Sequence, residues 1–182
     1  IETLDQTFGI KKEDVIGNQA PFDFDVSVKD IFSGLYTGAE VVIIPREYFS
    51  NPTLLMDYLC DHHITVLIWA VSAMCFVSIM NGFGYKIPED VRLIMFSGEV
   101  MPIKQLNRWR AALPKATYVN LYGPTEITCN CTYHVLENRE YALDESIPIG
   151  KSFSNEKVFL LDDEDHLVTE PGRQGEICAS GT

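Results

Sequence analysis

Two adjoining stretches decide the fold class: Thr117-Tyr118-Val119-Asn120-Leu121, followed directly by Tyr122-Gly123-Pro124-Thr125-Glu126. A β-prone run ends abruptly in a Gly-Pro turn, and the turn carries an aromatic ring, a hydroxyl and a carboxylate. In a parallel α/β sheet, ligands bind beyond the carboxyl ends of the strands, where such a turn would lie. These groups suit stacking on a base, hydrogen bonding to a phosphate and holding a hard cation. An ordinary strand-to-helix turn with a capping threonine is the alternative for these five residues alone.

Apolar runs and helical periods alternate along the chain before this turn. The short runs predict buried strands at 41–44, 65–69, 92–96 and 117–121. Between them, we expect helices whose apolar residues recur at helical spacing: one carrying Val28, Ile31, Phe32 and Leu35 and ending at Gly38, one begun by Asn51-Pro52 with Leu54, Leu55, Tyr58 and Leu59 inside, one capped by Ser72, and one from Met101-Pro102 to Leu113. This alternation predicts an α/β fold with a mostly parallel sheet flanked by helices.

The pattern changes after Glu126. Strand-like runs at 128–135, 158–161 and 176–179 are joined by polar turns instead of helices. We therefore predict an α/β subdomain over 1–126 and a smaller, more antiparallel β-rich continuation of the same domain over 127–182.

Composition narrows the classes of protein. Hydrophobic residues make up 46% and charged residues 22% of the 182 positions, which is typical of a folded domain. No apolar run is long enough to cross a bilayer. We therefore expect no membrane insertion, and the net charge of −12 argues against attraction to nucleic acid or to anionic membrane surfaces. The odd number of cysteines, five, favours a reducing cytoplasm over a disulfide framework.

Five short motifs occur in an order that resembles a known family. They are Phe24-Asp25-Val26-Ser27-Val28-Lys29-Asp30, Ser97-Gly98-Glu99, Asn120 to Glu126, Pro148-Ile149-Gly150-Lys151 and Gly175-Glu176-Ile177. The set resembles the adenylate-forming enzymes, specifically the amino-acid adenylation domains of nonribosomal peptide synthetases and the D-alanine–carrier-protein ligases. The Asn-x-Tyr-Gly-Pro-Thr-Glu match is the most specific of the five, and together they span nearly the whole chain.

This resemblance implies an ATP-dependent ligase. In the family, ATP and an amino acid give aminoacyl-AMP and pyrophosphate, and the aminoacyl group then passes to the phosphopantetheine thiol of a carrier protein. ATP and Mg²⁺ would be the cofactors. The carboxylate attacks the α-phosphate in line, so positioning and charge neutralisation account for most of the catalysis.

The resemblance also assigns roles to residues around the turn. It implies that Tyr122 stacks beside adenine, Asn120 faces the adenine amino group, and Gly123 with Ser97, Gly98 and Glu99 contributes to nucleotide binding. Thr125 would bond the α-phosphate and Glu126 would hold Mg²⁺, the two catalytic roles. A carboxylate beside phosphate oxygens is the usual environment of that ion.

The amino-acid side of the site is implied in the same way. Asp25 would pair with the α-ammonium, since a partly buried ammonium needs a compensating charge. An acid at the start of the following helix is the structural alternative for Asp25. The side-chain pocket would be lined by Val26, Lys29, Ile68, Met95, Ser97, Leu121, Cys129 and Asn130.

Two pocket positions depart from the D-alanine ligases. Those enzymes have a cysteine where this chain has Ser97 and an apolar residue where it has Lys29, which puts D-alanine selectivity in doubt. If Lys29 enters the pocket, its buried charge requires a partner, which favours a polar or acidic substrate side chain. Alternatively, Lys29 runs along its helix to solvent.

Several family elements do not occur in this sequence. The Gly-rich loop over the β- and γ-phosphates, the ribose-binding aspartate and the C-terminal lysine are missing, and the chain lacks an initial Met. We therefore expect an excised central segment that cannot adenylate alone. The alternatives are an acyl-CoA ligase type of activation, for a carboxylic acid without an amino group, and a non-catalytic nucleotide-binding module. Among relatives, the stretch over 19–117 most resembles the D-alanine ligases, but the choice between a stand-alone ligase and a synthetase module, and between the enantiomers, stays open.

Overall fold

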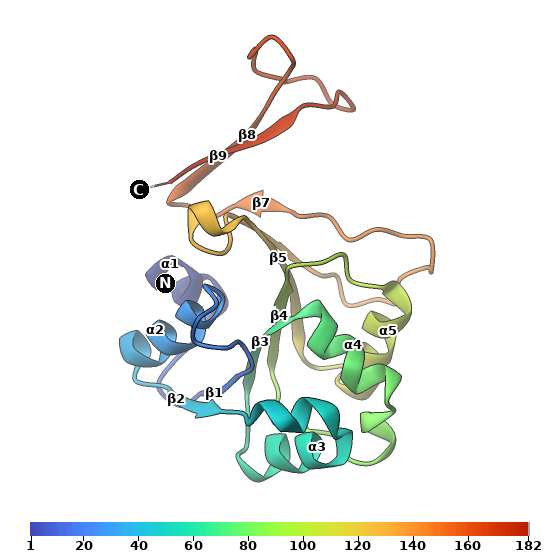
Figure 1. Cartoon of the computed structure of the whole chain (residues 1–182). Coiled ribbons are helices and arrows are strands. Elements are labelled where there is room, and N and C mark those ends of the chain that lie inside the picture. The colour runs from blue at the N-terminus through green and yellow to red at the C-terminus, as the bar shows by residue number, and fades with distance from the viewer. Residues whose placement is uncertain (182) are drawn as a thin grey trace.

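A seven-stranded sheet forms the centre of the protein in the computed structural model, which describes residues 1–181 (Figure 1). Its spatial order is β2-β1-β3-β4-β5-β6-β7, in which the first five strands are parallel and β6 and β7 are antiparallel to their neighbours. The bounds are β1 Val15–Asn18, β2 Glu40–Ile43, β3 Val66–Ala70, β4 Leu93–Ser97, β5 Thr117–Tyr122, β6 Thr132–Val135 and β7 Lys151–Ser152. The predicted, mostly parallel α/β fold is confirmed.

Helices cover both faces of this sheet (Figure 1). One face carries α1 Glu2–Phe8 and α2 Ser27–Thr37, and the other carries α3 Pro52–Asp61, α4 Val71–Ile79 and α5 Ile103–Ala112. Short 3₁₀ turns lie at η1 Arg46–Ser50, η2 Gly82–Gly84 and η3 Thr125–Ile127. None of the helices within 1–181 is long and apolar enough to cross a membrane.

The last part of the chain leaves the main sheet. The antiparallel pair β8 Glu156–Leu161 and β9 Glu176–Gly181 forms a separate hairpin that extends away from the helices (Figure 1). The β-rich segment expected over 127–182 is thus divided between two sheets, because β6 and β7 continue the large one and β8 and β9 form the small one.

Alternation along the strands sends neighbouring side chains into two separate cores. Trp69 and Trp109 belong to the core under α3, α4 and α5, where their rings meet edge to face. Ile68, Met95 and Leu121 belong to the core on the α1 and α2 face. This division matters for the site, because it assigns successive residues of one strand to opposite sides of the sheet.

Some local expectations were wrong or incomplete. Leu55 and Leu59 are buried inside α3 as expected, but Leu54 is 46% exposed and the buried face includes Met56 instead. Ser72 lies inside α4 and does not cap it; Ala70 holds the N-cap position with no side-chain bond. The elements α1, β1 and β7 were not predicted, since they are short and lack a periodic apolar pattern.

In helix α2 the apolar side is exposed and the polar side is buried, which is the reverse of an ordinary surface helix. Phe32 and Leu35 on its apolar face are 50% and 73% exposed, whereas Asp30 and Ser33 on the polar face are fully buried. Hydrogen bonds account for this, since Ser33 donates to Asp5 at 2.6 Å and Asp30 accepts from a buried asparagine of β1. The helix is therefore attached to the sheet through polar groups.

At the amino ends of the strands, Asp14 connects three of them. It is 3% exposed and accepts hydrogen bonds from Arg92 Nε at 2.7 Å, Thr65 Oγ1 at 2.8 Å and the Lys11 backbone N–H at 2.9 Å. Burial raises the pKa of Asp14, but these donors, Arg92 foremost, outweigh it and leave the pKa below its ordinary value.

We expect Asp14→Asn to lower the free energy of unfolding by about 2 kcal/mol, since charge-assisted bonds are lost while water partly solvates the half-exposed Arg92. Asp14 contributes stability above its unfolded pKa, and the contribution is lost as the pH falls through the depressed folded pKa. Urea unfolding at neutral and acidic pH measures both effects. Asp90→Asn, in an exposed ion pair with His63, is the control and should change little. Equal losses in the two variants would contradict the assignment.

Candidate active site

The turn after β5 lies at the carboxyl edge of the sheet and is open to solvent. Tyr122 is 37% exposed, and Thr125 and Glu126 in the 3₁₀ turn are also exposed. The backbone N–H of Cys131 donates to the Tyr122 carbonyl at 2.8 Å, which closes the loop back onto the strand. This backbone hydrogen bond closes the loop, and the Thr125 hydroxyl and the Glu126 carboxylate lie on its exposed side.

Gly123 is required by this closure. A Cβ on Gly123 would lie 2.6 Å from Asn130 Cα and 2.7 Å from the Cys131 nitrogen, both of them backbone atoms that cannot move aside easily. Only a residue without a side chain lets the two segments approach this closely.

The loop of residues 128–131 connects the turn to α2. Thr128 and Cys129 adopt φ values of 61° and 75°, a left-handed backbone that non-glycine residues rarely take. This conformation directs the Cys129 thiol to the Asp25 carbonyl, to which it donates at 2.9 Å across 104 residues of sequence. Asp25 and the turn, predicted to belong to one site, are thus brought together.

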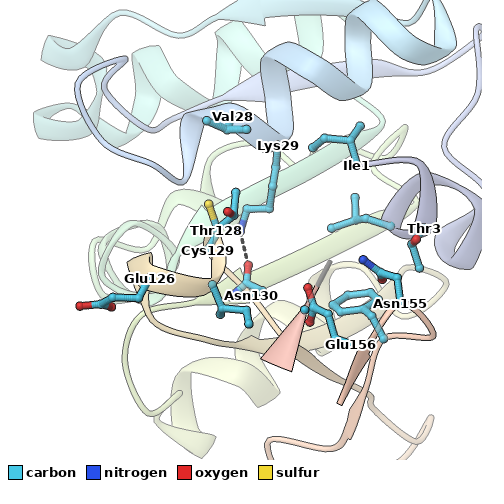
Figure 2. A pocket seen from close by; sticks show the side chains of 14 residues that line it. Ile1, Thr3, Val28, Lys29, Glu126, Thr128, Cys129, Asn130, Asn155 and Glu156 are labelled. Atoms are coloured by element: carbon cyan, nitrogen blue, oxygen red, sulfur yellow. Dashed lines mark hydrogen bonds between the residues drawn. The ribbon is translucent and has the colours of Figure 1, made fainter. Parts of the chain in front are cut away.

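Lys29 lies in the first turn of α2 and reaches the same loop. Its side chain is 4% exposed, and Nζ donates a hydrogen bond to Asn130 Oδ1, as Figure 2 shows. The alternative in which Lys29 runs along the helix to solvent was wrong. Its ammonium is directed toward the 128–131 loop instead of along the surface of the helix.

Burial shifts the protonation equilibria of this cluster. Desolvation lowers the pKa of Lys29, although the nearby Cys129, Asp30 and Asp25 partly restore it. Burial raises the pKa of the Cys129 thiol to about 11, against the opposing charge of Lys29, so the thiol is neutral at pH 7. Burial also raises the pKa of Asp30 to about 7, with its bond from Asn18 and the charge of Lys29 acting in the other direction. Burial therefore opposes the charged form of all three groups.

Two cavities meet at Glu126. The larger, of about 480 Å³, is lined by Glu126 together with Lys29, Cys129 and Asn130 (Figure 2). The smaller, of about 170 Å³, lies between the turn and β9 and includes Tyr122 and Glu126. Glu126, the expected metal ligand, therefore lies between the cavity that includes Tyr122 and the cavity that Lys29 lines.

Strand β5 separates the remaining predicted residues. Asn120 and Tyr122 point to one face and Leu121 to the other. Asn120 Nδ2 donates to the Pro148 carbonyl at 2.9 Å, which leaves Oδ1 as its free acceptor. Ile68, Met95 and Leu121 are buried in the core on the α2 face and do not line the larger cavity. Val26 lines a third cavity of about 430 Å³, beside Gln19 and Ala70 at the ends of β1 and β3.

The Ser97-Gly98-Glu99 segment ends β4 at the same edge. Ser97 is buried at the last strand position, whereas Gly98 and Glu99 are exposed. Gly98 has a φ of 94° and nothing within 4 Å of the position of a Cβ, so the backbone is accessible there. An open glycine backbone beside an exposed carboxylate fits the close approach of a nucleotide.

The residues present fit a phosphate-bound magnesium ion. Glu126 is exposed, and no hydrogen bond or ion pair within residues 1–181 uses its carboxylate. No cluster of three His, Cys, Asp or Glu side chains in that range could hold a metal by itself. A cation at Glu126 would take its other ligands from phosphate oxygens and water, as Mg²⁺ commonly does.

The sequence did not identify two polar residues of this region, Asn18 and Glu156. Asn18 Nδ2 donates to Asp30 Oδ2 at 2.7 Å and to the Ala20 carbonyl at 3.2 Å, which joins α2 to the end of β1. Glu156, at the start of β8, lines the larger cavity. The only sequence signal was the polar face of α2, where Lys29, Asp30 and Ser33 recur at helical spacing.

The family model of AMP-binding enzymes matches residues 1–182, the full length of the chain. The chain belongs to the AMP-binding enzyme family. The resemblance drawn from its motifs is confirmed.

Relatives within this family act on carrier proteins. The L-proline–[L-prolyl-carrier protein] ligase of Streptomyces coelicolor is 35% identical over 170 residues, covering 93% of this chain and 32% of its own. The D-alanine–D-alanyl carrier protein ligase of Bacillus cytotoxicus is 31% identical, covering 97% and 35%. Among solved structures, the Vibrio cholerae adenylation domain AlmE in complex with glycyl-adenosine-5′-phosphate has a TM-score of 0.84 at 26% identity, covering 97% of this chain and 33% of its own. The chain thus spans about a third of the length of these relatives.

We expect Gly123→Ala to displace the loop of residues 128–131 and to lower the free energy of unfolding by about 3 kcal/mol, through overpacking against backbone. Urea unfolding measures the loss. Gly172→Ala is the matched control, because its position is open but has a φ of 84°, and it should cost about 1 kcal/mol. A Gly123→Ala variant no less stable than the control would show that the loop does not need its close approach.

Proposed function

We propose that this chain is the central part of a ligase that activates an amino acid as aminoacyl-AMP with ATP and transfers it to the phosphopantetheine thiol of a carrier protein. The observation that carries the proposal is the Cys129 to Asp25 hydrogen bond, which holds an aspartate beside the loop that follows the Thr125-Glu126 turn. The carrier-protein relatives support the same class of reaction.

The residues have distinct tasks in this proposal. Asp25 binds the α-ammonium, which leaves the substrate carboxylate free to approach the α-phosphorus. One carboxylate oxygen forms the new O–P bond as the bond to pyrophosphate breaks, and the departing pyrophosphate keeps the electron pair. Thr125 donates to the α-phosphate, and Tyr122 and Asn120 hold the base. Mg²⁺ at Glu126 would neutralise charge on the phosphate oxygens.

The second half-reaction needs a partner thiol. A carrier-protein phosphopantetheine thiolate attacks the acyl carbon and releases AMP, so a thioester forms as the mixed anhydride breaks. All five cysteines are free thiols in the structure, which supports a reducing cytoplasm as the location in this proposal.

We expect the full-length protein to catalyse amino-acid-dependent exchange of pyrophosphate into ATP. Asp25→Asn should reduce kcat/KM for the amino acid by about 100-fold or more, because the α-ammonium loses its charged partner. Asp23→Asn, an exposed neighbour in the same loop, is the matched control and should change little.

Two results would contradict the proposal. Exchange supported only by carboxylic acids without an amino group, unaffected by Asp25→Asn, would indicate an acyl-CoA ligase type of activation. Absence of exchange with all amino acids and simple acids, combined with retained nucleotide binding in a calorimetric titration, would indicate a non-catalytic nucleotide-binding module.

The isolated chain should not catalyse this exchange. In the proposal, the β- and γ-phosphates and the reacting carboxylate are held by groups outside these 182 residues, so the transition-state charge would lack most of its partners. The same pyrophosphate exchange assay, run on the isolated chain and on the full-length protein at equal concentration, measures the difference. Comparable rates would show that the segment alone contains the complete catalytic machinery.

A further inference from the structure

Residues 19–26 form the loop between β1 and α2, and this loop carries Asp25, the residue proposed to bind the α-ammonium. The aromatic side chains of the loop do not anchor it, since Phe22 and Phe24 are 60% and 56% exposed. No side chain of residues 19–26 belongs to either core of the sheet. The position of the loop, and with it that of Asp25, therefore depends on polar contacts.

A buried hydrogen bond joins the two ends of this loop. Asn18, the last residue of β1, donates from Nδ2 to Asp30 Oδ2 in the first turn of α2, at 2.7 Å. Both side chains are buried. The same nitrogen donates to the Ala20 carbonyl, inside the loop, at 3.2 Å. An amide nitrogen has two N–H groups, so both of those of Asn18 are used at the base of the loop.

Stability alone does not account for a carboxyl group at position 30. The bond from Asn18 is the one hydrogen bond of the Asp30 side chain within residues 1–181, where its Oδ1 has no partner. A fully buried carboxyl with one oxygen unsatisfied costs free energy, and an apolar residue of similar size would cost less. Local choices that oppose stability in this way are expected where a residue serves a functional site.

A second buried hydrogen bond attaches α2 one turn further on without closing the loop. Ser33 Oγ donates to Asp5 Oδ1 of α1 at 2.6 Å, and both residues are buried. Neither of them flanks the loop of residues 19–26. The two bonds therefore differ in what they hold: the Ser33 bond attaches the helix to α1, whereas the Asp30 bond also closes the loop that carries Asp25.

We propose that Asp30 is a positioning residue for amino-acid binding: through Asn18 it closes the base of the 19–26 loop and thereby holds the Asp25 carboxylate where the α-ammonium binds. This inference rests on the function proposed above and adds two residues that contact no substrate. A loop that is already closed loses little further freedom when the amino acid binds, so more of the interaction with Asp25 appears as affinity. The bond needs an acceptor oxygen at position 30, which an amide supplies as well as a carboxyl.

Pyrophosphate exchange by the full-length protein tests this role, with the best substrate that the wild-type protein shows among the standard amino acids and D-alanine. Asp30→Ala should raise KM for that amino acid by about 30-fold, because Asn18 loses its partner and Asp25 its fixed position. The KM for ATP and kcat should each change by less than about 3-fold. Asp30→Asn keeps an acceptor and should keep KM for the amino acid within about 3-fold of the wild-type value.

Ser33→Ala is the matched control on the same helix. It removes a buried hydrogen bond of the same kind, so it should lower the midpoint of thermal unfolding about as much as Asp30→Ala does. Its KM for the amino acid should stay within about 3-fold of the wild-type value, because the loop remains closed. If Asp30→Ala does not fold, Asn18→Ala breaks the same bond from the strand and should raise this KM in the same way.

A double-mutant cycle shows whether Asp30 acts through Asp25. Asp30→Ala should lower kcat/KM for the amino acid by about 30-fold in the wild-type background but by less than about 3-fold beside Asp25→Asn, because the position of the loop matters little once its carboxylate is gone. A general loss of structure would instead lower kcat/KM by the same factor in both backgrounds.

The outcomes separate this inference from the proposed function. Equal increases of KM in Asp30→Ala and Ser33→Ala, or additive effects in the cycle, would overturn the positioning role and leave amino-acid adenylation standing. An increase in Asp30→Asn as large as that in Asp30→Ala would do the same. A wild-type protein that supports no exchange with any amino acid would overturn both.

Discussion

The close return of the 128–131 loop onto Gly123 is the constraint on which the rest of the site depends. Because that glycine has no side chain, the backbone of Asn130 can lie against it, and the left-handed conformation at Cys129 then turns a thiol toward Asp25 and an amide toward Lys29. The aromatic–hydroxyl–carboxylate turn and the start of α2 are joined through this one loop. A displacement at residue 123 would therefore change contacts between residues that are more than 100 positions apart in the chain.

Helix α2 is held by polar groups, which fix the direction of the side chains on its buried side. Asp30 and Ser33 are attached to β1 and α1 by hydrogen bonds, so Lys29 on the same side of the helix is directed inward although its charge opposes burial. Apolar contacts would attach the helix at a lower cost in free energy, but they would not position a cation. The apolar side of the same helix, which includes Phe32 and Leu35, is exposed in this chain.

Local signals predicted the parallel strands, the helices between them and the turn after β5, because apolar periodicity and Gly-Pro chemistry are properties of contiguous residues. They did not predict β1 or β7, whose residues form strands only because neighbours pair with them. The location of Lys29 could not be predicted from the sequence either. Its hydrogen-bond acceptor lies 101 residues away, and both a buried and a solvated lysine fit the same helical pattern. The Asn18–Asp30 bond was missed for the same reason, since nothing in either local sequence indicates burial.

The alternation of side chains along β5 separates two sets of residues. Asn120 and Tyr122 face one side of the sheet, and Leu121 between them faces the other, packed beside Ile68 and Met95. A substitution at the middle position reshapes the region beneath α2 while its two neighbours keep their orientation. The packing beneath α2 and the side chains presented at the turn can therefore change independently of each other, although one strand supplies both.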